Sequence, residues 1–166
     1  MLALLVAGLL LWQWQPPIAP GIQLRVGQTA PATEFRFIDG NVEQLAQMRG
    51  QPVLINFWAT SCAICLAEMP DVIALQKEFA GRFRHVAVAM PYDRADRVLD
   101  YQRRVQPELP IALDPLSKIV DAWGPVLGTP TRVLIDRQGR IAHYSLGAIK
   151  PASLRAQLQA LLDEST

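Results

Sequence analysis

The segment over residues 52–59 constrains the fold of this chain more than any other. It is a continuous apolar run, PVLINFWA, with β-branched and aromatic residues. A short run of this kind predicts a β-strand that is buried on both faces. Leu66, Met69, Ile73 and Phe79 then recur near helical spacing, which predicts a helix from 63 to about 80. A buried strand that passes directly into a helix is typical of α/β domains.

Strands and helices continue to alternate along the chain. The turn sequence Asp39-Gly40-Asn41 predicts a hairpin between residues 34–38 and 42–45. Pro70 should kink the helix over 63–80. The remaining pattern predicts strands at 83–90, 111–113, 132–136 and 141–146, and helices at 95–105, 117–123 and 151–162. This order indicates an α/β fold with a central mixed β-sheet flanked by helices.

The N-terminus has a different composition from the rest. Residues 1–14 begin with an apolar run that has no charge and is shorter than the roughly 20 residues of a spanning helix. The run resembles the apolar part of a signal peptide or signal anchor, with Trp12 and Trp14 at the membrane interface. The alternative is a core strand or helix of the domain. Residues 15–30 are rich in proline and predict a linker, so we expect the folded domain to span 31–166.

The overall charge excludes some classes of protein. The chain has 166 residues, with 16 Lys and Arg against 15 Asp and Glu. No strong net field would attract nucleic acid or an acidic surface. Half of the residues are apolar, which is too many for a disordered chain.

The chain has only two cysteines, Cys62 and Cys65, three residues apart where the buried strand meets the helix. A disulfide framework or a structural zinc site would need more ligands, and His85 and His143 are far away in sequence and are expected to be structural. A thiol at a helix N-terminus is stabilised as thiolate by free backbone N–H groups and the helix dipole. The spacing therefore predicts a redox dithiol, in which Cys62 attacks a disulfide and Cys65 resolves the mixed disulfide. Two alternatives are a pair of inert buried cysteines and a copper(I) site built on the two thiolates.

The sequence over 56–65, N-F-W-A-T-S-C-A-I-C, resembles the active-site segment of the TlpA/ResA/CcmG-like thioredoxins. Glu68 and Pro70 match the glutamate and proline that follow the second cysteine of this family, and residues 128–131, G-T-P-T, match its cis-proline loop. Residues 133–141 resemble its closing hairpin, and the likeness extends over about 26–162. The resemblance implies a thioredoxin-like fold with an N-terminal β-hairpin extension, and the activity of a thiol–disulfide oxidoreductase.

The resemblance also implies roles for single residues. Pro130 would be cis and lie against the dithiol, and the backbone of Thr129 would pair with an incoming peptide as an added strand. Trp58 would pack beside the dithiol. Glu68 would tune proton transfer, and Asn56 stands where cytosolic thioredoxins have a buried aspartate. Ser61 departs from the family, because it replaces the tryptophan before the first cysteine, and Ala63-Ile64 replaces a dipeptide that often contains proline.

Together these features predict a reductase of specific protein disulfides, such as those of cytochrome c or copper-site maturation. We expect it to work at the periplasmic or extracytoplasmic face, either anchored to the inner membrane by its N-terminus or secreted after cleavage. It would be re-reduced by a membrane or periplasmic thiol donor and would need no cofactor or metal. The alternative function is a copper(I)-binding or metallochaperone module, with Met69 or Met90 as further ligands. A peroxidase of the peroxiredoxin type is disfavoured because Ala59 stands where that chemistry uses a threonine.

Overall fold

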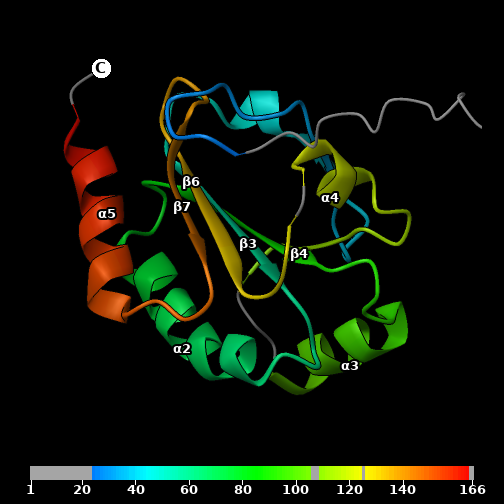
Figure 1. Ribbon diagram of the computed structural model, residues 1–166. Helices are drawn as coiled ribbons and strands as arrows, with labels where there is room; N and C mark the ends of the chain where they lie inside the picture. Colours follow the sequence, from blue (N-terminus) through cyan, green and yellow to red (C-terminus); the bar gives the residue numbers. More distant parts are fainter. Residues whose placement is uncertain (1–23, 106–108, 125, 165–166) are drawn as a thin grey trace, which may run out of the picture.

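The computed structural model describes residues 24–105, 109–124 and 126–164 (Figure 1). The segment over 1–14, with Trp12 and Trp14, lies outside the described residues. The proposed signal anchor therefore stays a prediction. Within the described part of the chain, no helix is long and apolar enough to cross a membrane.

The central element is a five-stranded mixed sheet. From edge to edge the strand order is β5 (Ile111–Leu113), β4 (Arg84–Ala89), β3 (Val53–Trp58), β6 (Thr131–Ile135) and β7 (Ile141–Leu146). Strand β3 pairs in parallel with β4 and antiparallel with β6, so it lies in the middle of the sheet. All six of its residues are buried, which confirms the strand predicted from the apolar run.

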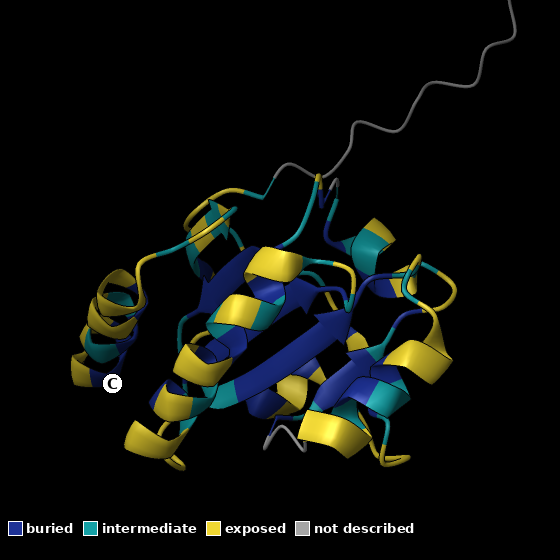
Figure 2. Cartoon of the chain, turned by 90° about the horizontal axis from the view of Figure 1, so that it is seen from below, coloured by how far each residue is buried: buried dark blue, intermediate teal, exposed yellow. Residues whose placement is uncertain are grey.

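Helices α2 (Ala63–Glu78), α3 (Ala95–Val105) and α5 (Pro151–Asp163) cover one face of the sheet (Figure 1). Leu54 of β3 packs with Val72 of α2 and Leu158 of α5. The ring of Trp58, on the same face of β3, lies 5.0 Å from the ring of Tyr101 in α3. Figure 2 shows the strands as buried and the outer sides of these helices as exposed.

The opposite face is covered by smaller elements. These are the hairpin of β1 (Glu34–Arg36) and β2 (Val42–Gln44), the 3-10 helix η1 (Leu45–Met48) and α4 (Lys118–Ala122). Side chains alternate along a strand. Ile55 and Phe57 therefore point to this face, where they join Phe35 and Trp123 in one buried cluster.

The predicted elements are confirmed, with ends that differ from the prediction by at most two residues. Helix α2 ends at Glu78, before Gly81, whose φ of +74° is readily reached by glycine alone. The inward face of α2 differs from the prediction, because Val72 and Leu75 are buried while Leu66 and Ile73 are only partly buried. The helix turns this face toward the sheet and α5, which sequence spacing alone does not define.

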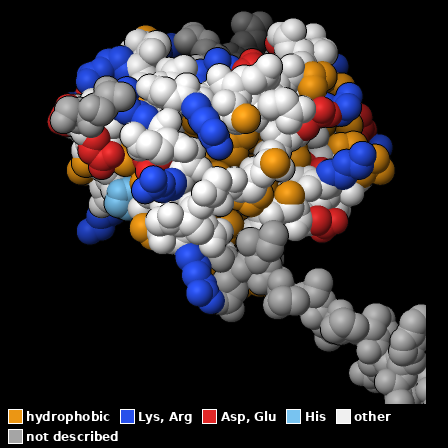
Figure 3. Space-filling model, turned by 90° about the horizontal axis from the view of Figure 1, so that it is seen from above, with side chains coloured by type: hydrophobic (Ala, Val, Ile, Leu, Met, Phe, Trp, Pro, Cys, Tyr) orange, Lys and Arg blue, Asp and Glu red, His pale blue; other side chains and the backbone are white. Residues whose placement is uncertain are grey.

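The surface at the end of the molecule away from the start of α2, where the dithiol lies, carries charges of both signs. Figure 3 shows Lys, Arg, Asp and Glu side chains spread over it, with hydrophobic side chains in small groups between them. Close to this face, Gly27 and Ala30 donate backbone hydrogen bonds to the carbonyls of Ile141 and Gly139. These bonds tie the segment before β1 to the β6–β7 hairpin.

Candidate active site

The two cysteines lie where β3 passes into α2. Cys62 is the N-cap residue of α2, and its backbone N–H bonds the carbonyl of Ala59 across a tight turn. Cys62 and Cys65 form a disulfide with a Cα–Cα distance of 5.2 Å. Cys65 donates its backbone N–H to the sulfur of Cys62 at 3.1 Å. A thiolate at Cys62 would therefore accept this bond and lie at the positive end of the helix dipole.

The two sulfur atoms differ in access. The Cys65 residue is 2% exposed, whereas Cys62 is partly exposed at the end of the helix. An incoming disulfide can therefore reach Cys62 first, and Cys65 can react only with a group that is already attached to Cys62. The roles of Cys62 as the attacking sulfur and Cys65 as the resolving sulfur stay a prediction, with which this difference in access agrees.

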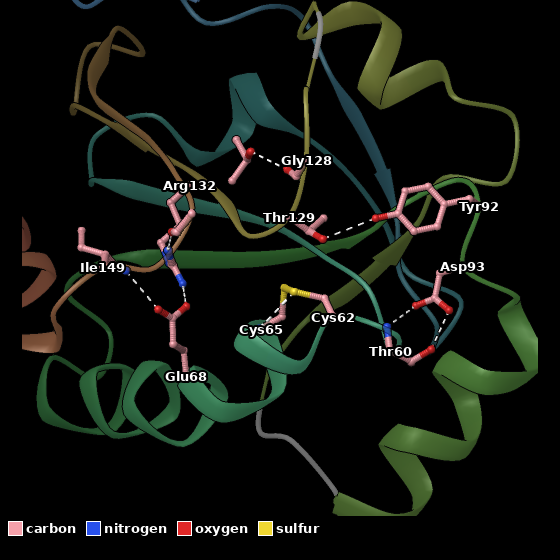
Figure 4. The surroundings of a disulfide bond; sticks show 12 residues. Thr60, Cys62, Cys65, Glu68, Tyr92, Asp93, Gly128, Thr129, Arg132 and Ile149 are labelled. Carbon is pink, nitrogen blue, oxygen red and sulfur yellow. Dashed lines mark hydrogen bonds and ion pairs between the residues drawn. A yellow bond between two sulfur atoms is a disulfide. The ribbon is translucent and has the colours of Figure 1, made fainter.

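The loop before β6 faces the disulfide (Figure 4). Its Thr129–Pro130 peptide bond is cis, and Pro130 is buried. The hydroxyl of Thr131 donates to the carbonyl of Gly128 at 2.7 Å, which holds the loop closed. The structure thus brings the loop with Thr129 to the dithiol, although this loop is more than 60 residues away in sequence (Figure 4).

The loop between β4 and α3 forms a third side of the site (Figure 4). The carboxylate of Asp93 accepts hydrogen bonds from the backbone N–H and the hydroxyl of Thr60, at 2.5 and 2.6 Å. The hydroxyl of Tyr92 lies 3.4 Å from that of Thr129. This loop therefore connects the segment before the dithiol with the segment before Pro130. Sequence analysis missed Tyr92 and Asp93, because nothing in the local sequence of a loop predicts partners that are 37 and 33 residues away.

Glu68 belongs to a buried ion pair. One of its carboxylate oxygens accepts from the guanidinium of Arg132 in β6, and the other accepts from the backbone N–H of Ile149 at 3.0 Å. The side chains of Arg132 and Glu68 are 3% and 15% exposed. Arg132 also donates to the carbonyl of Gly147 at 3.1 Å. Burial lowers the pKa of Arg132, while the charge and hydrogen bond of Glu68 act in the opposite direction.

Arg132 was not identified from the sequence as a site residue. A signal was present, because Arg132 stands beside the run Val133–Ile135 in a strand that lies between two others. A charged side chain on a central strand is covered by the rest of the fold and needs a partner.

Three more polar side chains lie on the same face of the sheet. Asn56 stands directly opposite Arg132 in the β3–β6 register, and it is 2% exposed. One polar atom in each of Asn56, Trp58 and His85 has no hydrogen-bond partner among the described residues. Burial lowers the pKa of His85 to about 3, and the charge of Arg132 acts in the same direction. His85 is therefore neutral at physiological pH. Its Nδ1 lies 3.4 Å from the side-chain oxygen of Gln76.

Trp58 packs in one buried cluster with Cys65 and Met69, which agrees with a position beside the dithiol. Met90 belongs to the cluster on the other face of the sheet. The described residues contain no group of three or more His, Cys, Asp or Glu side chains that could hold a metal ion. His143 lies half-buried on the edge strand β7.

A mixed sheet of this topology, with a C-x-x-C pair at the start of α2 and a cis-proline loop facing it, defines a thioredoxin-fold thiol–disulfide oxidoreductase. The family model for Redoxin matches residues 25–162, so the chain belongs to the Redoxin family.

Similar proteins share this architecture. The thiol–disulfide oxidoreductase ResA of Bacillus thuringiensis subsp. konkukian is 27% identical over 145 residues, which cover 87% of this chain and 80% of that protein. The solution structure of a thioredoxin of Neisseria meningitidis is 29% identical, with a TM-score of 0.76 over 83% of this chain and 92% of that one. The exposed lipoprotein thioredoxin Etrx1 of Streptococcus pneumoniae is 25% identical, with a TM-score of 0.70 over 78% and 98%.

Proposed function

We propose that the protein is a reductase of specific protein disulfides that works outside the cytoplasm. The observation that carries the proposal is the pair of sulfurs at the start of α2, one accessible and one buried. The reducing direction is the one that the resemblance to the TlpA/ResA/CcmG-like thioredoxins favours.

The reaction proceeds in two exchanges. The thiolate of Cys62 attacks one sulfur of the substrate disulfide, forms a mixed disulfide, and releases the other substrate sulfur as a thiolate that takes up a proton. Cys65 then loses its proton and attacks the sulfur of Cys62. The bond Cys62–Cys65 forms, and the second substrate sulfur leaves with its electron pair and is protonated. The substrate gains two electrons and two protons. This chain supplies both electrons and the proton of Cys65, and the second proton comes from the solvent, to which Cys62 released its own on becoming a thiolate.

The substrate segment is expected to lie between the dithiol and the loop before β6. The backbone of Thr129 would pair with an extended peptide as an added strand. Exposed apolar side chains stand in the three segments that form the site, with Ile64 48%, Tyr92 62% and Leu127 76% exposed. They suit a substrate with apolar residues beside its cysteine. Cysteines that await haem or copper are the substrate class that the TlpA/ResA/CcmG resemblance suggests.

The location is proposed from the N-terminus and from one relative. The uncharged apolar start over 1–14 fits a signal anchor or signal peptide. The pneumococcal relative is an exposed lipoprotein by its description. A reductase in an oxidising compartment needs a thiol donor to restore its dithiol, and a membrane or periplasmic protein would fill this role.

Trapping tests the proposal. In the Cys65→Ser variant the mixed disulfide cannot be resolved, so substrate proteins should remain attached to Cys62 in extracts prepared from cells with an intact envelope. The same proteins should be absent from a Cys62→Ser control, which retains the buried thiol only. Equal capture by the two variants, or capture of cytoplasmic proteins alone, would overturn the proposal.

A further inference from the structure

The ion pair of Glu68 and Arg132 affects the charge beside the dithiol in a way that neither residue does alone. Glu68 follows Cys65 by three positions in α2, and residues three apart on a helix are neighbours, about 5–6 Å between Cβ atoms. An unpaired carboxylate at that distance would oppose loss of the Cys65 proton, because a like charge raises the pKa of a thiol. Arg132 comes from a different element and places a positive charge on that carboxylate (Figure 4).

Glu68 and Arg132 are the charged groups on the Cys65 side of the site. The carboxylate of Asp93 lies on the Cys62 side, where both of its oxygens accept hydrogen bonds from Thr60. On the strand next to β3, His85 is neutral because burial lowers its pKa to about 3. Asn56, which stands opposite Arg132, has no charge. From α2 itself, Asp71 shares a small hollow with Glu68 and Arg132, and it is exposed. From the segment before α5, Ile149 contributes only its backbone N–H.

We propose that Arg132 is a positioning residue for disulfide exchange, which cancels the charge of Glu68 beside the dithiol and thereby allows Cys65 to lose its proton. Both oxygens of Glu68 are already engaged, one by Arg132 and one by Ile149. The pair therefore acts as a neutral unit rather than as a free base. This role rests on the proposed function, because Cys65 needs to lose its proton only when it attacks the mixed disulfide. That proton is then taken up by the departing substrate sulfur.

The test uses the thiol–thiolate titration of Cys65 as the only cysteine, in a Cys62→Ser background, followed by ultraviolet thiolate absorbance. Arg132→Met leaves Glu68 unpaired, so the thiolate fraction of Cys65 at a pH below its midpoint should fall about tenfold, the change expected for one nearby charge that is partly screened. Glu68→Gln leaves Arg132 unpaired, so the fraction should rise. The double variant should return to the parent curve, and Arg132→Lys should stay close to it.

Arg137→Met is the matched control. Arg137 follows the same strand at its far end and donates to the carbonyls of Gly50 and Leu162. Its loss should destabilise the chain without moving the titration of Cys65. If Arg132 only stabilised the fold, the titration of Cys65 in the double variant would be shifted at least as far as in Arg132→Met.

The outcomes separate this proposal from the proposed function. Shifts of opposite sign in the two single variants, with a restored double variant, support it. Equal curves for the parent and Glu68→Gln overturn it, and this variant remains informative even if Arg132→Met does not fold. Because the titration needs no disulfide substrate, its result stands whether or not the parent protein reduces any protein.

Discussion

His85 makes the stability of this fold depend on pH. The ring is buried on the face of β4 that α2 covers, and its Nε2 has no partner among the described residues. Burial lowers its pKa to about 3, and Arg132 acts in the same direction. In the unfolded chain the ring has its ordinary pKa of about 6.5.

The size of the effect follows from these two values. Between about pH 6.5 and 3 the unfolded chain binds a proton at His85 and the folded chain does not. Stability from the neutral ring is therefore fully present above pH 6.5 and is lost as the pH falls toward 3. From pH 7 to pH 5 the loss amounts to about 2 kcal/mol, because one pKa unit corresponds to about 1.4 kcal/mol.

Urea unfolding of the oxidised protein at pH 7 and pH 5 measures this loss. His85→Asn lacks the titrating group, so it should lose about 2 kcal/mol less than the parent between the two pH values, although it is less stable at both. His143→Asn is the control, because that ring lies half-buried on the edge strand β7 rather than in the core. If the parent and His85→Asn lose the same free energy of unfolding, His85 does not fold as a neutral buried ring.

Two further changes test contacts that hold the site and the hairpin. Asp93→Ala removes the two carboxylate oxygens that accept hydrogen bonds from Thr60, so the free energy of unfolding in urea should fall by about 1–2 kcal/mol. The control is Asp96→Ala, at an exposed position of α3, which should unfold at the same urea concentration as the parent. Thr33→Val leaves the indole N–H of Trp123, which now donates to Thr33 at 2.9 Å, without an acceptor in the core. It should cost about 1–3 kcal/mol by the same assay, and parent-like stability would contradict this reading of the contact.

The parts of the fold that depend on local patterns could be predicted from the sequence. Strand β3 is apolar throughout, and α2 begins where that run ends, so the position of Cys62 at a helix N-terminus followed directly. The approach of Thr129 and Pro130 to the dithiol came only from the family resemblance. No local pattern connects that loop with residues 62–65.

The contacts around the dithiol could not be predicted in the same way. Glu68 was identified by its place after the second cysteine, but its partner Arg132 is 64 residues away. Whether Arg132 faces solvent or Glu68 depends on β6 lying between β3 and β7, which is a property of the whole sheet. Asp93 and Tyr92 are brought to the site by the parallel pairing of β3 with β4, and their loop follows β4 at the edge where α2 begins.

The reduction potential of the Cys62–Cys65 pair tests the central claim most directly. The domain over residues 31–166 is equilibrated with glutathione or dithiothreitol buffers, and the oxidised fraction is read from the accessible thiols. A reductase predicts a potential below about −200 mV, near the range of thioredoxins and glutaredoxins. A potential near about −120 mV, typical of strong disulfide oxidants, would contradict the account.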